Sequence, residues 1–333
     1  MTNIGSFNSD TENSYGWRAV VPATSANLGC AFDCGGLALK LYLKALFIPS
    51  SNTEDLTIEY TGKTPKGFPL DPSNLVLHAL CYAAGELGAP PPCGHVQVES
   101  DIPISVGLGS SAAAVIAGLL LGARYAGADV DAEKLLRWAE KIEGHIDNAA
   151  AAYHGGLVFA LGDNTERVVT MRTDFPESIR LIAVSPSIAV PTHKARQVLP
   201  AFYGRGDVVH TLQRVALLAA TCFSGNFDLF PELFDDKLHQ PYRQELVPGI
   251  ERCLRLRREG LLGVAISGSG SSVIAFATRH EAEIARALQE IFAAEGVQAE
   301  ARSTSADNSG AWVTREPVPV TKRRTAQNLG RTE

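Results

Sequence analysis

The chain carries at residues 103–113 the stretch Pro103-Ile104-Ser105-Val106-Gly107-Leu108-Gly109-Ser110-Ser111-Ala112-Ala113. Two closely spaced glycines and two serines precede an alanine- and leucine-rich segment, which is typical of a loop that leads into a helix N-terminus. Glycines let the backbone approach a phosphate group, and the free N–H groups of the first helical turn point toward it, together with the positive end of the helix dipole. The stretch therefore predicts a phosphate-binding loop, and we expect its ligand to be the phosphate chain of a nucleotide.

This loop belongs to neither of two common nucleotide-binding motifs. No lysine follows the glycines, as it does in a P-loop, and the glycine spacing and later acidic residue of a dinucleotide-binding fold are missing. Ser110 and Ser111 can cap the helix, and one of their hydroxyls can also bind Mg2+ at the phosphates. A Gly-x-Gly turn before a helix is common in itself, so other segments of the chain are needed to establish that this loop binds phosphate.

The length and composition are those of an ordinary globular protein of two domains. The chain has 333 residues, of which 45% are hydrophobic and 20% charged, and its net charge is -6. This acidic balance offers no electrostatic footprint for nucleic acid, so we expect no nucleic-acid partner. The six cysteines are scattered without CxxC pairs, which argues against a zinc site or a disulfide framework and indicates reduced thiols in the cytoplasm.

Both ends of the chain are polar. Residues 1–16 have neither a basic start nor an apolar core, so they predict a flexible lead-in rather than a signal peptide. The most apolar helix candidate, residues 112–123, is too short to span a bilayer, and we expect no membrane partner. Prolines and the basic cluster Lys322-Arg323-Arg324 follow residue 313, so residues 314–333 are predicted to form a disordered tail.

The hydrophobic period changes repeatedly between that of strands and that of helices. We expect strands at 18–21, 38–48, 56–60, 179–185, 263–266 and 272–277, and helices at 73–87, 131–143, 208–222, 249–259 and 281–294. Strand pairs come early rather than in regular strand–helix–strand repeats, which favours an α+β fold over a doubly wound parallel sheet. Charge and proline near residues 170–176 predict a boundary between a first domain, 17–175, and a second domain, 176–313.

Two further glycine-containing segments accompany the loop at 107–113. The first is Pro22-Ala23-Thr24-Ser25-Ala26-Asn27-Leu28-Gly29, followed by Phe32-Asp33 and Gly35-Gly36-Leu37-Ala38-Leu39. The second is Gly263-Val264-Ala265-Ile266-Ser267-Gly268-Ser269-Gly270-Ser271-Ser272, which alone would indicate only a turn between strands. In this order the three segments resemble the motifs of the GHMP kinases, the superfamily that groups galactokinase, homoserine kinase, mevalonate kinase and phosphomevalonate kinase.

Within this superfamily the details most resemble the homoserine kinase family. These details are the segment that begins at Pro22 and three further stretches. The three stretches are Glu143-Gly144-His145-Ile146-Asp147-Asn148, His154-Gly155-Gly156-Leu157-Val158 and Leu238-His239-Gln240-Pro241-Tyr242-Arg243. The resemblance implies an N-terminal lobe like domain 2 of ribosomal protein S5, a C-terminal ferredoxin-like lobe, ATP and Mg2+ as cofactors, and a cytoplasmic homodimer. It also implies phosphorylation of the side-chain hydroxyl of L-homoserine, a step of threonine biosynthesis.

The chain departs from the family pattern beside the implied acceptor site. Cys30-Ala31 stands where the family usually has Pro-Gly, and Cys34 replaces a small hydroxyl residue. These changes alter the freedom of the backbone at this place, so the acceptor is less firmly implied than the type of reaction.

An amide and a carboxylate, such as those of Asn27 and Asp33, suit the ammonium and hydroxyl groups of a small amino alcohol, although each residue alone is more typical of a turn or a helix cap. A lone histidine is commonly a structural hydrogen-bonding residue. An arginine fork binds a carboxylate bidentately, and homoserine carries a carboxylate whereas a sugar does not. The resemblance implies acceptor contacts from Asn27, Asp33, His145, Asp147, Thr192, Arg196 and Arg243.

The resemblance also implies the metal ligands and the mechanism. Glu140, on the helix expected at 131–143, would hold Mg2+ together with Ser111, and Glu143 is the competing candidate. Phosphoryl transfer depends on positioning and electrostatic stabilisation more than on a strong base. We therefore expect direct attack by the acceptor hydroxyl on the γ-phosphate, with Asn148 near the transferred group. The alternative makes Asp33 a general base.

Two other functions stay open at this point. Another GHMP kinase, acting on a different small alcohol, would keep the three motifs without needing both Arg196 and Arg243. A non-catalytic binding protein would keep the fold and lose the phosphate loop or the metal carboxylate.

Overall fold

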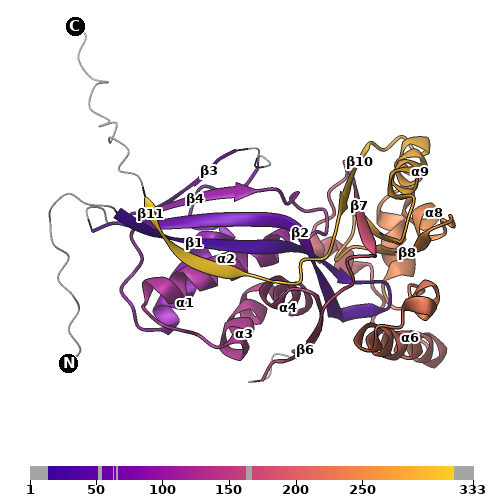
Figure 1. Ribbon diagram of the computed structural model, residues 1–333, viewed down its shortest axis with the longest axis horizontal. Coiled ribbons are helices and arrows are strands. Elements are labelled where there is room, and N and C mark those ends of the chain that lie inside the picture. Colours follow the sequence, from indigo (N-terminus) through magenta and orange to yellow (C-terminus); the bar gives the residue numbers. More distant parts are fainter. Residues whose placement is uncertain (1–13, 52–54, 63, 65–66, 163–166, 319–333) are drawn as a thin grey trace, which may run out of the picture.

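The computed structural model describes residues 14–51, 55–62, 64, 67–162 and 167–318 as two lobes that lie side by side (Figure 1). Its elements in chain order are β1 (Ser14–Asn27), β2 (Ala31–Pro49), β3 (Leu56–Tyr60), α1 (Leu75–Glu86), β4 (Gly94–Ser100), α2 (Ser110–Tyr125), α3 (Ala132–Glu143), α4 (Asp147–His154), β5 (Leu157–Leu161), β6 (Val169–Thr173), β7 (Arg180–Pro186), α5 (Thr192–Gln197), α6 (Arg205–Ser224), η1 (Phe227–Glu232), α7 (Gln240–Arg243), η2 (Gln244–Leu246), α8 (Ile250–Leu254), β8 (Leu261–Ile266), β9 (Val273–Ala277), α9 (Glu281–Ala294), β10 (Ala299–Thr304) and β11 (Trp312–Val318).

The N-terminal lobe is built on a seven-stranded sheet. Its order is β11-β1-β2-β4-β3, and β5 and β6 extend it from the first part of β2. Neighbouring strands are antiparallel except β3 and β4. Helices α1 to α4 cover one face (Figure 1). Gly118 of α2 lies where an added Cβ would meet the carbonyl oxygen of Val76 in α1, so these two helices pack closely.

The C-terminal lobe has a four-stranded antiparallel sheet of order β10-β7-β9-β8. Strand β7 is followed by helices. Strands β8 and β9 then form a pair, and α9 leads into β10. This is the split β-α-β arrangement of ferredoxin-like folds. Ile284, Leu288 and Phe292 of α9 are buried against the sheet. The α+β prediction with a ferredoxin-like second lobe is therefore confirmed.

One predicted helix is shorter than expected. Helix α8 ends at Leu254, whereas the sequence pattern predicted a helix as far as Glu259. Arg255, Arg257, Arg258 and Glu259 are all exposed, so this segment has no buried face that would stabilise further helical turns.

The C-terminal segment differs from the expectation of a tail beginning at residue 314. After β10 the chain returns to the first lobe, where the Tyr42 hydroxyl donates to Asp307 over 2.6 Å and β11 pairs with β1. Residues 314–318 are thus strand, and so are residues 14–16 of the expected lead-in. Pro317 was one reason to predict a disordered tail, but a proline is tolerated in an edge strand such as β11. The remainder of both predicted segments, 1–13 and 319–333, lies outside the described residues.

In the described part of the chain, no helix combines the length and the apolar character needed to cross a membrane. All six cysteines are free thiols.

Candidate active site

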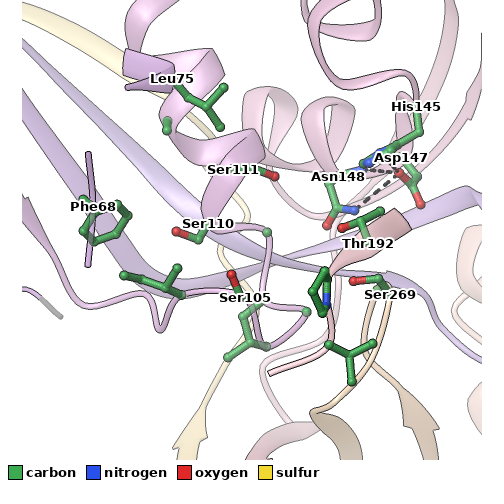
Figure 2. A pocket seen from close by; sticks show the side chains of 18 of the residues that line it. Phe68, Leu75, Ser105, Ser110, Ser111, His145, Asp147, Asn148, Thr192 and Ser269 are labelled. Atoms are coloured by element: carbon green, nitrogen blue, oxygen red, sulfur yellow. Dashed lines mark hydrogen bonds and ion pairs between the residues drawn. The ribbon is translucent and has the colours of Figure 1, made fainter. Parts of the chain in front are cut away.

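A cavity of about 310 Å3 lies between the phosphate loop and the second lobe (Figure 2). It is lined by every residue expected to contact the acceptor or the transferred group: Asn27, Asp33, His145, Asp147, Asn148, Thr192, Arg196 and Arg243. The fold thus brings these residues together from β1, β2, the loop before α4, α4, α5 and α7 around a single space.

The phosphate loop forms as the sequence predicts. Helix α2 begins at Ser110, and its N-cap residue Gly109 has a left-handed φ of 67°. Because this N-cap residue is a glycine, it has no side chain to accept from the N–H groups of the first turn, which suits an anion-binding helix N-terminus. An added Cβ at Gly109 would meet the hydroxyl of Thr24, and one at Gly107 would meet the carbonyl oxygen of Ser267. Only glycine fits at these two positions.

The three glycine-containing motifs converge on this loop. The backbone N–H of Thr24, in the first motif, donates to the Leu108 carbonyl over 3.2 Å. From the third motif, the Ser267 hydroxyl donates to the Gly107 carbonyl over 2.6 Å, and the Ser272 N–H donates to the carbonyl of Val106 over 2.9 Å. The third motif therefore packs on the phosphate loop, and its residues Gly268 and Ser269 line the cavity.

The predicted loop residues divide into two groups. Those that line the cavity are Ile104, Ser105, Gly107, Leu108, Gly109, Ser110 and Ser111. Pro103, Val106, Ala112 and Ala113 do not line it. Ala112 and Ala113 are fully buried in α2, where they pack into the core and hold the loop from behind.

The structure pairs Ser111 with Glu143, the competing candidate, and not with Glu140. The Ser111 hydroxyl donates to Glu143 Oε2 over 3.0 Å, and partial burial raises the pKa of the Glu143 carboxyl above its ordinary value. Glu140 lies one turn earlier in α3, is only 5% exposed, and packs so closely on Gly162 that an added Cβ there would lie 2.5 Å from Glu140 Oε1. This hydrogen bond favours Glu143 over Glu140 as the carboxylate that shares a site with Ser111.

A hydroxyl and a carboxylate beside a phosphate cradle suit Mg2+, which takes few ligands from a protein and the rest from phosphate and water. No three histidine, cysteine, aspartate or glutamate side chains of the described residues form a group that could hold a metal by themselves. The pair of Ser111 and Glu143 fits a metal that arrives with the nucleotide.

A polar chain runs through His145, Asp147 and Asn148 at the start of α4 (Figure 2), and it continues to Thr24 beside the phosphate loop. Asp147, only 2% exposed, accepts from the backbone N–H of Asn148 over 2.8 Å and lies 3.0 Å from Nδ1 of His145. Burial alone would lower the pKa of His145, but the hydrogen bond and charge of Asp147 outweigh it and raise this pKa. The Thr24 hydroxyl donates to Asn148 Oδ1 over 2.8 Å, and Asn148 Nδ2 donates to Asp147 Oδ1 over 3.4 Å, so the second hydrogen of this amide nitrogen is left for a ligand. Thr24, although part of the quoted motif, was not among the predicted site residues.

The loop between β1 and β2 has an unusual backbone. Asn27, Leu28, Gly29 and Asp33 all have left-handed φ values, between 39° and 78°. The Asn27 side chain donates to the Gly268 carbonyl over 2.7 Å and accepts from the backbone N–H of Asp33 over 2.9 Å. Both ends of this amide hold backbone groups, which indicates a positioning role in addition to the expected contact with the acceptor.

Two arginines lie at this end of the cavity. Arg196 donates through both Nη atoms to the two carboxylate oxygens of Asp33, over 3.0 and 3.1 Å. Arg243 is only 3% exposed and donates to the carbonyls of Ala195 and Gly268 over 3.2 and 3.0 Å. One carboxylate and two guanidinium groups therefore meet at the same end of the cavity.

The opposite end is apolar and was not predicted. The rings of Tyr60 and Phe68 stack with centroids 4.5 Å apart and planes 7° from parallel. The Asn74 side chain donates to the Tyr60 hydroxyl over 2.7 Å, and Leu75 lies beside it on the cavity wall. This end suits a planar aromatic group. The sequence signal was only an aromatic pair before helix α1, and nothing local connected it with the phosphate loop.

The fold and the site define a kinase of the GHMP class. Residues 74–156 match the family model for the GHMP kinases N terminal domain, and residues 215–294 match that for GHMP kinases C terminal. The homoserine kinase of Solibacter usitatus is 38% identical over 296 residues, which are 89% of this chain and 96% of that protein. That of Desulfitobacterium hafniense is 37% identical over 89% of this chain and 99% of that protein.

A solved structure agrees with these sequence relatives. The crystal structure of homoserine kinase from Cytophaga hutchinsonii superposes with a TM-score of 0.80 at 25% identity, covering 93% of this chain and 100% of that one. The chain belongs to the homoserine kinase family of the GHMP kinases, which confirms the resemblance inferred from the three motifs.

Proposed function

We propose that this protein transfers the γ-phosphoryl group of ATP to the side-chain hydroxyl of L-homoserine, giving O-phospho-L-homoserine and ADP, a step of threonine biosynthesis. The observation that carries the proposal is the paired charge at one end of the cavity, where Asp33 and Arg196 form a bidentate ion pair beside Arg243. Full-length relatives named homoserine kinase support it.

The acceptor would replace this internal ion pair. Homoserine is a zwitterion, so its ammonium group can bind Asp33 while its carboxylate binds Arg196 and Arg243. Thr192, at the start of α5, adds a hydroxyl on the same wall. A sugar or an isoprenoid alcohol lacks an ammonium group, so it cannot satisfy both partners of the ion pair.

The departures from the family pattern do not touch the acceptor. Cys30 and Ala31 are 2% and 0% exposed, and their side chains pack in the core of the N-terminal lobe. Cys34 is half-buried against the same core and does not line the cavity either. None of these three side chains is therefore presented to the substrate, which is consistent with homoserine as the acceptor.

ATP would lie along the cavity with its base at Tyr60 and Phe68 and its phosphates on the loop that precedes α2. Ser111 and Glu143 would hold Mg2+ there. When bound, Mg2+ supplies neutralisation of the negative charge on the phosphate oxygens.

The chain then contributes positioning and hydrogen bonds to the transfer. The acceptor hydroxyl attacks the γ-phosphorus in line, the bond from phosphorus to the bridging oxygen of ADP breaks, and the hydroxyl proton passes to a phosphate oxygen. The Asn148 amide and the N–H groups of α2 donate to the developing negative charge. With the acceptor bound, the Asp33 carboxylate would hold its ammonium group, which favours this scheme over one in which Asp33 acts as a general base.

The test is ADP release with ATP, Mg2+ and one of L-homoserine, L-threonine, mevalonate or galactose, against a reaction without acceptor. We expect turnover with L-homoserine and formation of its O-phosphate, detected by 31P NMR. L-threonine is the matched control, because it carries the same zwitterion with its hydroxyl one carbon closer. Turnover with another acceptor and none with homoserine would refute the proposed substrate.

We further propose that the protein is a cytoplasmic homodimer. An apolar hollow of about 600 Å3 lies between β5, β6 and α6, and Leu161 and Met171 on its wall are 61% and 59% exposed. On α6, Leu212 and Phe223 are 57% and 40% exposed, and Phe223 also lines this hollow. Exposed apolar side chains of this kind can pack against the same patch of a second copy about a two-fold axis, and β6 has a free outer edge among the described strands. The six free thiols suit the reducing cytoplasm.

Sedimentation velocity tests this dimer. Wild type should sediment as a dimer and Leu212→Glu as a monomer. Leu70→Glu, at an exposed position in the loop before α1, is the matched control and should remain dimeric. A monomeric wild type, or a dimer that Leu212→Glu leaves intact, would remove this surface from consideration.

A further inference from the structure

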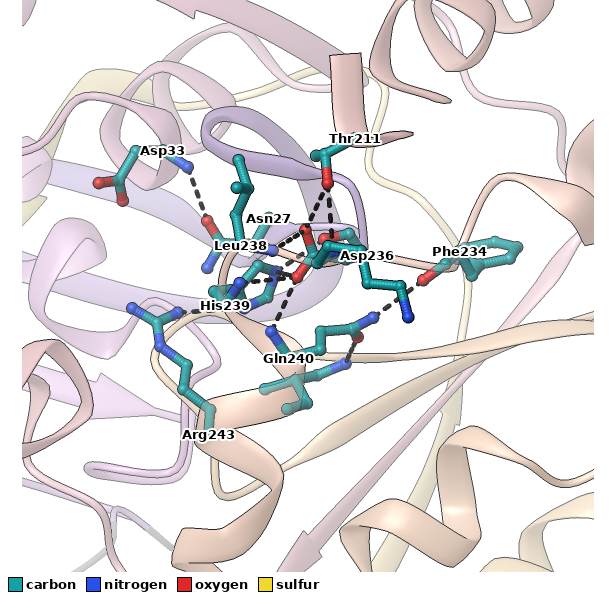
Figure 3. Close-up of polar contacts among 12 residues, drawn as sticks. Asn27, Asp33, Thr211, Phe234, Asp236, Leu238, His239, Gln240 and Arg243 are labelled. Carbon is teal, nitrogen blue, oxygen red and sulfur yellow. Dashed lines mark hydrogen bonds and ion pairs between the residues drawn. The ribbon is translucent and has the colours of Figure 1, made fainter. Parts of the chain in front are cut away.

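A buried polar cluster lies behind the acceptor end of the cavity (Figure 3). Asp236, only 2% exposed, accepts from the backbone N–H groups of Leu238, His239 and Gln240 over 3.0, 2.8 and 2.8 Å. Three such hydrogen bonds fix the backbone at the start of the short helix α7. The motif Leu238–Arg243, which was recognised in the sequence without a role for its histidine, is therefore held rigidly from its first residue.

His239 is completely buried, and its ring lies among the Gly29 carbonyl, the Arg243 guanidinium and the Asp236 carboxylate, whose Oδ2 is 3.6 Å from Nε2. Nε2 lies 2.7 Å from the carbonyl oxygen of Gly29, which can only accept, so Nε2 carries the hydrogen. Nδ1 lies 3.5 Å from Nη1 of Arg243, which can only donate. The ring is therefore neutral, with Nδ1 as an acceptor. Burial agrees with this state, because it lowers the pKa of His239 to about 4.

The loop that His239 contacts requires external support. Four of its residues have left-handed backbones, and three of them, Asn27, Leu28 and Asp33, are not glycine. Such conformations persist only where the surroundings hold them. Gly29 packs so tightly on the second lobe that an added Cβ would lie 2.6 Å from the Phe234 carbonyl oxygen.

The ring of His239 also contacts this loop through an aromatic stack. Phe32 lies parallel to it, with centroids 5.2 Å apart and planes 20° from parallel, and the Arg243 guanidinium lies 5.1 Å from the Phe32 centroid. His239 thus touches the loop at Gly29 and at Phe32, and it also touches the arginine of the second lobe.

We propose that His239 is a positioning residue for the acceptor: it joins the loop that carries Asn27 and Asp33 to the guanidinium of Arg243. The groups that bind the ammonium and the carboxylate of the acceptor come from different lobes, and His239 sets the distance between them. This role rests on the proposed function only for the identity of the acceptor.

This role predicts different effects on the binding of the two substrates. His239 contacts the loop and arginine at the acceptor end and does not line the cavity, whereas the apolar end is formed by other residues, including Tyr60 and Phe68. Loss of its hydrogen bonds should therefore weaken acceptor binding and leave nucleotide binding unchanged. A purely structural residue would affect both substrates together.

The experiment compares His239→Leu with His239→Gln. Leucine is of similar size and removes both hydrogen bonds, whereas the amide nitrogen of glutamine can replace Nε2 as the donor to Gly29. The measurements are KM for L-homoserine, kcat, and Kd for a non-hydrolysable ATP analogue by calorimetry. We expect His239→Leu to raise KM for homoserine at least tenfold, with Kd for the analogue within twofold of wild type, and His239→Gln to recover most of the loss.

If His239→Leu does not fold, Phe32→Leu provides the same test. Phe32 is only partly buried, and its loss removes the stack while the hydrogen bond to Gly29 remains. Three results would overturn the proposal: an unchanged KM for homoserine in the folded variant, an equal loss of affinity for homoserine and for the ATP analogue, or a KM for homoserine that is as high in His239→Gln as in His239→Leu. Wild-type turnover is measured first, so a failure of the proposed function appears as inactivity of the unmodified protein and is distinguishable from these outcomes.

Discussion

Lowering the pH from 7 to 4 should destabilise this protein through His239. The ordinary pKa of a histidine is 6.5, and in the folded protein burial, assisted by the nearby Arg243, lowers it to about 4 against the opposing effects of Asp236, Gly29 and Asp33. Between these two values the unfolded chain binds a proton that the folded chain does not. The free energy of unfolding therefore falls as the pH falls through this range.

The size of the effect follows from the two pKa values. Each pKa unit between them is worth about 1.4 kcal/mol, so the loss reaches about 3 kcal/mol once the pH is below about 4. Above pH 6.5 the ring is neutral in both states and contributes no pH dependence. The loss is large compared with the roughly 5–15 kcal/mol by which a typical domain is stable.

Urea unfolding between pH 4.5 and 7.5 measures this effect if wild type is compared with His239→Gln. Every other titrating group is common to both proteins, so the difference between their free energies of unfolding isolates His239. We expect wild type to lose about 2–3 kcal/mol more than the variant over this range. His78→Gln, at an exposed position on α1, is the control and should follow wild type. A difference that is independent of pH, or that grows in the opposite direction, would refute the neutral buried histidine.

Three further predictions concern the metal, the acceptor and the core. Glu143→Gln should reduce kcat at least about tenfold, because it removes the carboxylate beside the phosphate loop, whereas Glu140→Gln should leave kcat nearly unchanged; steady-state kinetics of the pair decides between them. Arg196→Ala should raise KM for homoserine roughly tenfold to a hundredfold, as expected for a lost charged hydrogen bond, with the Kd of an ATP analogue unchanged by calorimetry. Gly118→Ala should lower the free energy of unfolding in urea by about 1–3 kcal/mol, since its new Cβ would meet the carbonyl oxygen of Val76.

Features that depend on neighbouring residues in the chain could be predicted from the sequence. The phosphate loop is an example, because glycines at 107 and 109 and the apolar segment after Ser111 define both the turn and the helix that follows. Helix α9 is another, and its observed bounds, Glu281–Ala294, equal the predicted ones because its hydrophobic period and its flanks agree. Convergence of the three motifs was accessible only through the resemblance to a family.

Features that depend on tertiary contacts could not be predicted in this way. Strand β11 is stabilised by pairing with β1, which lies almost three hundred residues away, and its own composition resembles a tail. Glu140 and Glu143 both occupy the last turns of α3, and helical periodicity alone does not say which of them faces Ser111. The stacked Tyr60 and Phe68 carry no local signal for a nucleotide base.

The ion pair between Asp33 and Arg196 explains how such a site can select its acceptor. A ligand that enters must separate these two charges, and each charge then needs a new partner in a partly desolvated cavity. A zwitterionic amino acid supplies both partners, so the exchange leaves no charge unpaired. A neutral sugar or a simple carboxylic acid leaves at least one of them unsatisfied, at a cost of about 1–3 kcal/mol or more. In the proposed mode of binding, the same residues would thus attract one class of alcohol and reject the others without a steric barrier.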